Sequence, residues 1–246
     1  MKRIVLVHAV SDGGMCIRNI IRYIEWMKRL GYRFVSLDQI AIADSKGKYL
    51  SLVADDAYKC VRTNLMPILQ RYAIPCTLFV PPGLLGLKAN DPQLLQHACY
   101  ENEDMMSIED LKEWSENGYE VGFHTNLHID LSVTDPVIQN EDFVKGITQL
   151  KKWGYSPDKF AYPFGRLPKD CASYQKLLSQ YGFKYAYTLW PGNVDSQFPL
   201  FVSRICLGDH TPVWWNVLKT IGWLDYRLQN KCELAQKPCI YKENIL

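Results

Sequence analysis

The sequence lacks the features that mark several classes of protein. Its 246 residues contain no low-complexity tract, no long run of like charge and no internal repeat, which excludes extended disorder and repeat architectures. The net charge is only +2 at pH 7, and the basic residues form no stripe of the kind that binds nucleic acid. A nucleic-acid polymer is therefore not the expected partner.

Long apolar runs are also missing. No stretch reaches the roughly 20 residues that a transmembrane helix needs, so we expect no transmembrane segment. The apolar run after Met1 is shorter than the core of a signal peptide, and it ends at the polar residues 11–14. These two absences predict a cytoplasmic protein.

The eight cysteines include no C-x-x-C pair and are scattered, mostly through apolar segments. Such spacing favours reduced, packed thiols over a disulfide framework, and it agrees with a reducing compartment. We therefore predict no structural disulfide.

What the sequence does contain is a regular alternation of short apolar runs with stretches of helical periodicity. Strands are predicted at residues 1–8, 32–37, 50–54, 76–80, 119–123, 159–162, 184–188 and 200–207. Helices are predicted at residues 17–30, 64–72 (capped by Asn64), 107–117, 136–153, 170–181 and 213–228. This order predicts an α/β fold with a parallel sheet, and about seven such units suit a single distorted (β/α) barrel over residues 1–246. An open doubly wound sheet is the alternative.

Polar residues follow several of the predicted strands. His8, the pair Asp55 and Asp56, His124 and the turn at residues 162–165 all lie just past a strand's carboxyl end, where barrel enzymes place their chemistry. Consecutive strand residues point to opposite faces, so Asp55 and Asp56 cannot share one role unless the chain turns there. We expect one of them to bind a metal and the other to act as a base.

The segment H-T-N-L-H at residues 124–128 places two imidazoles four residues apart, and these are neighbours if the segment forms one helical turn. Asp56 adds a third ligand from another strand end. Two histidines and one carboxylate leave an open position for water, which is the pattern of catalytic zinc. Zinc is favoured, but the same ligand types bind iron, and cobalt, nickel and manganese also remain open.

The neighbouring residues suggest roles around such a metal. Asp55, next to a ligand, could accept a proton from the attacking water, and the turn at Phe164 and Gly165 could donate an N–H to an oxyanion. A leaving amine needs an acid, and His8 and His210 both follow apolar strands. His97 lies in the long irregular segment 84–106 and is expected to be solvated.

These motifs resemble those of the polysaccharide deacetylase (NodB-like) family of carbohydrate esterases. The family's T-F-D-D-G appears as V-A-D-D-A at residues 53–57, its H-[ST]-x-x-H is intact at residues 124–128, and its R-x-P-Y turn is represented by A-Y-P-F-G at residues 161–165. The resemblance implies a distorted (β/α) barrel that removes an N-acetyl group from a hexosamine. The roles it implies are base for Asp55, divalent-metal ligands for Asp56, His124 and His128, and oxyanion or substrate contacts for Tyr162, Phe164 and Gly165.

The position of the general acid points to one branch of that family. The branch that resembles the poly-N-acetylglucosamine deacetylases has a permuted motif order, with an L/Y-H-x-V start before the D-D motif, and L-V-H-A-V at residues 6–10 is similar to that start. His8 is therefore favoured as acid, with His210 as the competitor. The third motif lacks its arginine, and no D-x-x-D-W motif is present to supply a partner for the acid.

The expected function is a metal-dependent hydrolase that removes an N-acetyl group from an amino-sugar-containing substrate. Glycosides, nucleotide-linked sugars and lipid-linked glycan precursors are the candidate substrates for a cytoplasmic enzyme. A deformylase or another small C–N amidohydrolase on the same site is one alternative. A degenerate barrel that binds glycans without catalysis is the other, because the first and third motifs are altered.

Overall fold

The computed structural model describes residues 1–44, 46–97, 100, 102–195 and 197–225. The strands are β1 (Lys2–Val7), β2 (Arg33–Phe34), β3 (Tyr49–Asp55), β4 (Cys76–Val80), β5 (Glu120–Phe123), β6 (Lys159–Ala161), β7 (Tyr185–Tyr187) and β8 (Ile205–Cys206). The α-helices are α1 (Ile17–Arg29), α2 (Leu37–Ile42), α3 (Met66–Tyr72), α4 (Pro92–His97), α5 (Ile108–Glu116), α6 (Pro136–Lys152), α7 (Cys171–Gln180) and α8 (Val213–Thr220). The short helical turns are the π-helical η1 (Val61–Leu65) and the 3-10 turns η2 (Pro82–Leu84) and η3 (Pro163–Gly165). No helix within these ranges is both long and apolar enough to cross a membrane.

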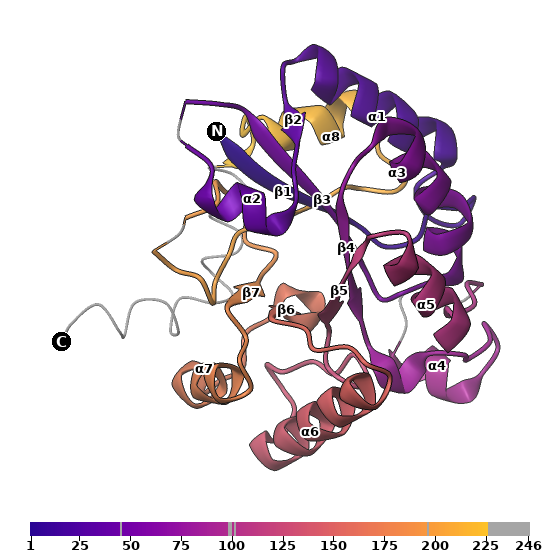
Figure 1. The fold of residues 1–246 in the computed structure, drawn as a ribbon, viewed down its shortest axis with the longest axis vertical. Coiled ribbons are helices and arrows are strands. Elements are labelled where there is room, and N and C mark those ends of the chain that lie inside the picture. Colours follow the sequence, from indigo (N-terminus) through magenta and orange to yellow (C-terminus); the bar gives the residue numbers. More distant parts are fainter. Residues whose placement is uncertain (45, 98–99, 101, 196, 226–246) are drawn as a thin grey trace.

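The strands form one sheet, and every strand pair in the described part of the chain is parallel. The order is β7-β6-β5-β4-β3-β1-β8, with β2 paired to the first residues of β3. Figure 1 shows the strands at the centre with helices such as α1, α3, α5, α6 and α7 around them. The predicted alternation of strands and helices is confirmed.

One short segment joins the two ends of this sheet. Val202 pairs with Tyr187 of β7, and a few residues later Cys206 of β8 pairs with Leu6 of β1. The sheet therefore curls into a distorted barrel, as predicted, and the open doubly wound alternative is wrong. The strand expected over residues 200–207 is shortened to β8 because the chain changes partner within it.

The apolar residues form layers inside and outside the curled sheet. Side chains alternate along β1, so that Leu6 packs inside with Val53 and Phe79, whereas Val5 and Val7 face the helices. A second outer layer lies between β5, β6, α6 and α7. With the interior filled by side chains, polar residues are left for the strand ends, as the barrel architecture predicts.

Several element boundaries differ from expectation. Helix α2 occupies part of a stretch predicted as a loop, and it starts with a capping box formed by Ser36 and Gln39. Asn64 does not cap α3: its side-chain amide donates to the Val10 carbonyl at 2.7 Å, and the turn η1 precedes the helix. The last helix ends at Thr220 rather than at residue 228, and residues 226–228 lie outside the described ranges.

Of the cysteines that the structure describes, Cys16, Cys60, Cys76 and Cys206 belong to no disulfide. This agrees with packed thiols rather than a disulfide framework, and the reduced state stays a prediction. Cys99, Cys232 and Cys239 lie outside the described residues.

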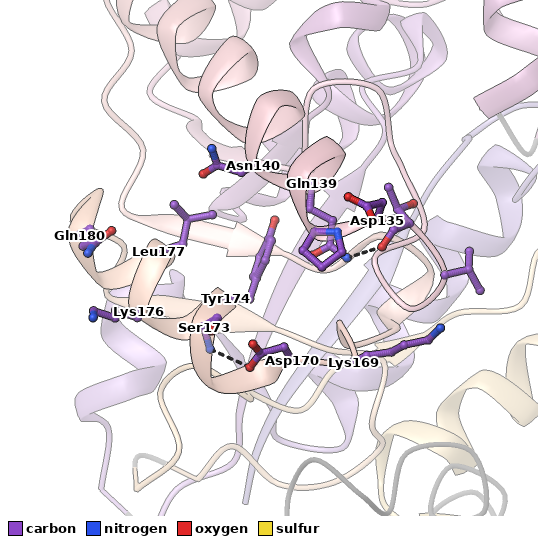
Figure 2. A pocket seen from close by; sticks show the side chains of 13 residues that line it. Asp135, Gln139, Asn140, Lys169, Asp170, Ser173, Tyr174, Lys176, Leu177 and Gln180 are labelled. Carbon is purple, nitrogen blue, oxygen red and sulfur yellow. Dashed lines mark hydrogen bonds between the residues drawn. The ribbon is translucent and has the colours of Figure 1, made fainter.

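A cavity of about 560 Å³ lies between the N-terminal part of α6 and helix α7 (Figure 2). The two N-cap residues, Asp135 and Asp170, and the aromatic ring of Tyr174 belong to its lining. None of the site residues predicted from the sequence lines this cavity. The predicted chemistry lies elsewhere on the same rim, at the ends of β1, β3 and β5.

Candidate metal centre

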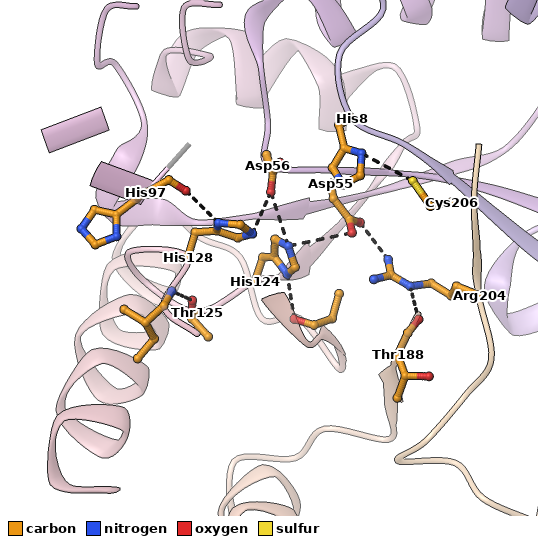
Figure 3. Close-up of polar contacts among 12 residues, drawn as sticks. His8, Asp55, Asp56, His97, His124, Thr125, His128, Thr188, Arg204 and Cys206 are labelled. Carbon is orange, nitrogen blue, oxygen red and sulfur yellow. Dashed lines mark hydrogen bonds and ion pairs between the residues drawn. The ribbon is translucent and has the colours of Figure 1, made fainter. Parts of the chain in front are cut away.

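Asp56, His124 and His128 come together at the carboxyl ends of β3 and β5 (Figure 3). The Nε2 atoms of His124 and His128 lie 3.4 Å and 3.3 Å from Asp56 Oδ1. All three side chains are buried, and their ligand atoms lie within 4.8 Å of one another. Three donor atoms thus converge on one point, although they come from two different strand ends.

The loop that carries the two histidines is not the helical turn that the spacing suggested. Thr125 and His128 both adopt left-handed backbone conformations, with φ of 58° and 53°. This path still brings the two rings to a centroid distance of 4.9 Å. Non-glycine residues in this region are uncommon, and such strain gathers at functional sites.

Backbone carbonyls fix the orientation of both imidazoles. His124 Nδ1 donates to the Ala161 carbonyl at 2.7 Å, and His128 Nδ1 donates to the His97 carbonyl at 2.9 Å. Each Nε2 lone pair is therefore left to face Asp56, as in metal sites where the second ring nitrogen is tied down. Burial also lowers the pKa of His128, which favours the neutral imidazole that a metal needs. The contribution of His97 is its backbone carbonyl, and the residue itself is partly exposed.

Asp56 has the properties of a carboxylate that is short of a cation. Both of its oxygens are buried and accept no hydrogen bond from the described residues. Burial by itself raises the pKa of Asp56, but the nearby His128 and His124 outweigh it and hold the pKa below its usual value. A buried carboxylate without donors is costly, so these residues fit a divalent metal ion. The ligand types do not select among zinc, iron and cobalt.

The chain turns sharply at the aspartate pair. Asp56 and Ala57 have φ of 71° and 61°, so two left-handed residues follow the end of β3. Because of this turn, both carboxylates face the same site, and Asp55 Oδ2 lies 3.8 Å from His124 Nε2. The position of Ala57 is one where glycine carries no steric penalty.

Arg204 is a residue of this site that sequence reasoning missed. Its Nη1 donates to Asp55 Oδ1 at 2.8 Å, its Nε donates to the Thr188 carbonyl at 3.1 Å, and both charged side chains are buried. The third motif has no arginine, and this one comes from the segment that joins β7 to β1. Its signal in the sequence was a lone charge within the apolar run at residues 200–207.

Removing Arg204 should destabilise the fold. Arg204→Met leaves the buried Asp55 carboxylate without its partner, which costs about 3–5 kcal/mol in the free energy of unfolding. Arg204→Lys keeps the positive charge and should lose less. Urea unfolding of the three proteins measures this order, and wild-type stability in Arg204→Met would contradict the assigned ion pair.

Asp142 of α6 holds the histidine loop in place. It accepts hydrogen bonds from the backbone N–H groups of Asn126 at 2.7 Å and Leu127 at 3.0 Å. Burial raises the pKa of Asp142 to about 6, and the two N–H donors offset only part of this effect. An acid with a raised pKa in the folded state stabilises the fold at low pH, and that contribution is lost as pH rises through the folded pKa.

The stability of the protein should therefore contain a pH-dependent part due to Asp142. Its contribution to the free energy of unfolding should fall by up to about 3 kcal/mol between roughly pH 4 and pH 6. Asp142→Asn cannot titrate and should lack this fall. Urea unfolding of both proteins from pH 4 to 8 provides the measurement, and a difference independent of pH would contradict the prediction.

The structure places His8 in the site and leaves His210 at the surface. His8 follows β1 and is close enough to Asp55 and Asp56 for their charges to act on it. Burial lowers the pKa of His8, but the contact with Cys206 and the charges of Asp56 and Asp55 outweigh it and raise the pKa to about 10. His210 is exposed. Of the two candidate acids, only His8 lies beside the predicted base.

The turn η3 offers one N–H group to the site. Phe164 has a φ of 57°, and its ring lies over His128 with a centroid distance of 4.5 Å. Gly165 N–H donates to the Tyr162 carbonyl at 2.9 Å, whereas the Phe164 N–H has no acceptor among the described residues. The Tyr162 side chain is buried, and its hydroxyl donates to the Leu200 carbonyl at 3.3 Å. Within this turn, Phe164 is thus the donor candidate.

Comparison with known proteins agrees with this geometry. The model of the polysaccharide deacetylase family matches residues 43–186, which is more than half of the chain. A poly-β-1,6-N-acetyl-D-glucosamine N-deacetylase of Staphylococcus aureus is 26% identical over 201 residues, which are 76% of this chain and 65% of that protein. The match thus spans somewhat less than two thirds of the relative's length.

Solved structures show the same fold. IcaB from Ammonifex degensii superposes with a TM-score of 0.71 at 24% identity, covering 91% of this chain and 96% of that one. The Streptococcus pyogenes deacetylase PplD, solved in complex with acetate, superposes with a TM-score of 0.70 at 20% identity, covering 89% and 97%. With its curled parallel sheet, its buried Asp-His-His triad and its matched motifs, the chain belongs to the polysaccharide deacetylase family.

Proposed function

We propose that the protein is a metal-dependent hydrolase that removes an N-acetyl group from an amino-sugar-containing glycan. The observation that carries this proposal is the convergence of Asp56, His124 and His128 beside Asp55 and His8. The name of the staphylococcal relative, an N-deacetylase, supports the reaction, and so does the acetate in the streptococcal structure, because acetate is the expected product.

The residues of the site can be assigned to the parts of amide hydrolysis. A divalent ion held by Asp56, His124 and His128 would supply a Lewis acid that lowers the pKa of water. Asp55 takes the proton of the attacking water, and Arg204 holds that carboxylate in place. The Phe164 N–H stabilises the negative charge that develops on the acetyl oxygen. His8 gives a proton to the amine nitrogen as the C–N bond breaks, which yields acetate and a free amino sugar.

The substrate class is proposed at two levels. An N-acetylated glycan follows from family membership. The finer candidates are β-1,6-linked N-acetylglucosamine chains, after the relative's name, and the glycosides, nucleotide-linked sugars and lipid-linked precursors predicted from the sequence. The cytoplasmic location stays a prediction.

Acetate release by the purified, zinc-loaded protein tests this function. Oligomers of β-1,4- and β-1,6-linked N-acetylglucosamine and a nucleotide-linked N-acetylglucosamine are the probes. We expect chelator-sensitive release of acetate from at least one of them. Formate release from N-formyl analogues alone would favour the deformylase alternative, and glycan binding without any release would favour the non-catalytic barrel.

A further inference from the structure

Cys206 lies directly beside His8 (Figure 3). Its Sγ is 4.0 Å from His8 Nδ1, which is at the long end of the range for hydrogen bonds to sulfur. The thiol is partly exposed and belongs to no disulfide. The sequence contains no D-x-x-D-W motif, so it identified no carboxylate partner for the candidate acid. In the structure, the residue beside His8 is Cys206.

The main chain fixes this contact. Cys206 pairs with Leu6 in the ladder between β8 and β1, and Leu207 N–H donates to the Leu6 carbonyl at 3.0 Å. His8 lies two residues after Leu6, so the alternation of side chains brings it to the inner face of the barrel. Cys206 packs against that same inner face. The neighbourhood of sulfur and imidazole therefore follows from strand register.

The hydrogen bonds of the thiol define its role toward the imidazole. The Cys206 S–H donates to the Leu207 carbonyl at 3.5 Å, which leaves a sulfur lone pair for His8. Sulfur can then accept the hydrogen on His8 Nδ1. The other ring nitrogen, Nε2, remains for a substrate, and the ring keeps one orientation.

We propose that Cys206 is a positioning residue for His8: its sulfur holds the Nδ1–H group and thereby keeps Nε2 directed at the leaving amine. This inference rests on the proposed function, in which His8 is the general acid. In that step the Nε2–H bond breaks, the amine nitrogen gains the proton as the C–N bond breaks, and the neutral imidazole keeps its hydrogen on Nδ1.

The other groups around His8 do not accept a hydrogen bond from its Nδ1. Asp55 and Asp56 act on it through their charges, and the Tyr100 ring lies at a centroid distance of 6.1 Å. The Tyr100 hydroxyl itself donates to Asp209. Among the described residues, Cys206 is the hydrogen-bond partner of Nδ1. A thiol is a weaker acceptor than a carboxylate, but it can still fix the orientation of the ring.

Activity on two substrates distinguishes a role of Cys206 in positioning His8 from a purely structural role. Cys206→Ala should lower kcat for acetate release from N-acetylglucosamine oligomers by up to about tenfold, the value of one ordinary hydrogen bond, with KM and metal content unchanged. The alkaline limb of its pH profile should move to lower pH. Hydrolysis of 4-nitrophenyl acetate should be spared, because nitrophenolate leaves without a proton. Cys206→Ser should restore much of the amide activity, and Cys16→Ala, at another partly exposed cysteine, should behave as wild type.

A double-mutant cycle and an NMR measurement complete the test. In a His8→Ala background, Cys206→Ala should have no further effect, whereas equal losses in both backgrounds or equal losses on both substrates would overturn the inference. Full amide activity in His8→Ala would overturn it together with the acid assignment. If no probe releases acetate, the proposed function fails. In that case ¹⁵N NMR of the His8 ring alone tests the contact between Cys206 and His8. A proton on Nδ1 that Cys206→Ala perturbs supports the contact, and an unchanged ring spectrum overturns it.

Discussion

Asp55→Asn is expected to abolish turnover while leaving the metal site filled. Asparagine keeps the shape of the side chain and can still accept the hydrogen bond from Arg204 Nη1, but it cannot take a proton from water. Loss of a general base costs roughly 100-fold to 10,000-fold in rate. We therefore expect kcat for acetate release to fall by this factor, with zinc content unchanged by elemental analysis.

This experiment also needs a control for loss of stability in the Asp55→Asn variant. Asp55→Asn leaves the Arg204 guanidinium buried without a counter-charge, so some stability will be lost. Measurements should therefore be made well below the melting temperature of the variant, which thermal unfolding defines. Asp195→Asn, an exposed aspartate outside the site, is the matched control and should retain full activity. Full activity in Asp55→Asn with normal zinc would show that another group is the base.

His128→Ala is expected to lose the metal itself. His128 supplies one of the three ligand atoms, and its Nε2 lies 3.3 Å from Asp56 Oδ1. Loss of an outer-shell partner already lowers metal affinity by roughly 10- to 100-fold, and loss of a direct ligand should exceed that. Activity should fall with the metal content and should recover only in part at high zinc concentrations.

His210→Ala is the matched control for that variant, because His210 is exposed and is not one of the triad's ligands. It should bind zinc and release acetate as the wild type does. Isothermal titration of zinc into the chelator-treated proteins gives the affinities directly. Equal zinc affinity in His128→Ala and wild type would rule out the triad as the metal site.

The sequence by itself determined most of the fold and the composition of the candidate site. Periodicity placed the main strands and helices because burial imposes a spacing of two or about 3.6 residues on the chain. The order of those elements then implied a parallel barrel with its polar residues at one rim. The motifs at residues 53–57 and 124–128 named Asp55, Asp56, His124 and His128 because these are local patterns of chemically distinctive side chains.

Only the tertiary structure decided how those residues meet. Left-handed turns at Asp56 and His128 bring both carboxylates and both imidazoles to one point. Asp and His adopt this conformation more often than most non-glycine residues do, but no local sequence pattern placed it at these two positions. Arg204 and Cys206 joined Asp55 and His8 because a short segment changes its strand partner from β7 to β1. Such contacts span up to about 200 residues of chain, as between His8 and Cys206, so they depend on strand register rather than on any local pattern. The tertiary structure also distinguished the two candidate acids, because His8 lies beside Asp55 whereas His210 is exposed. The sequence alone could not make this distinction.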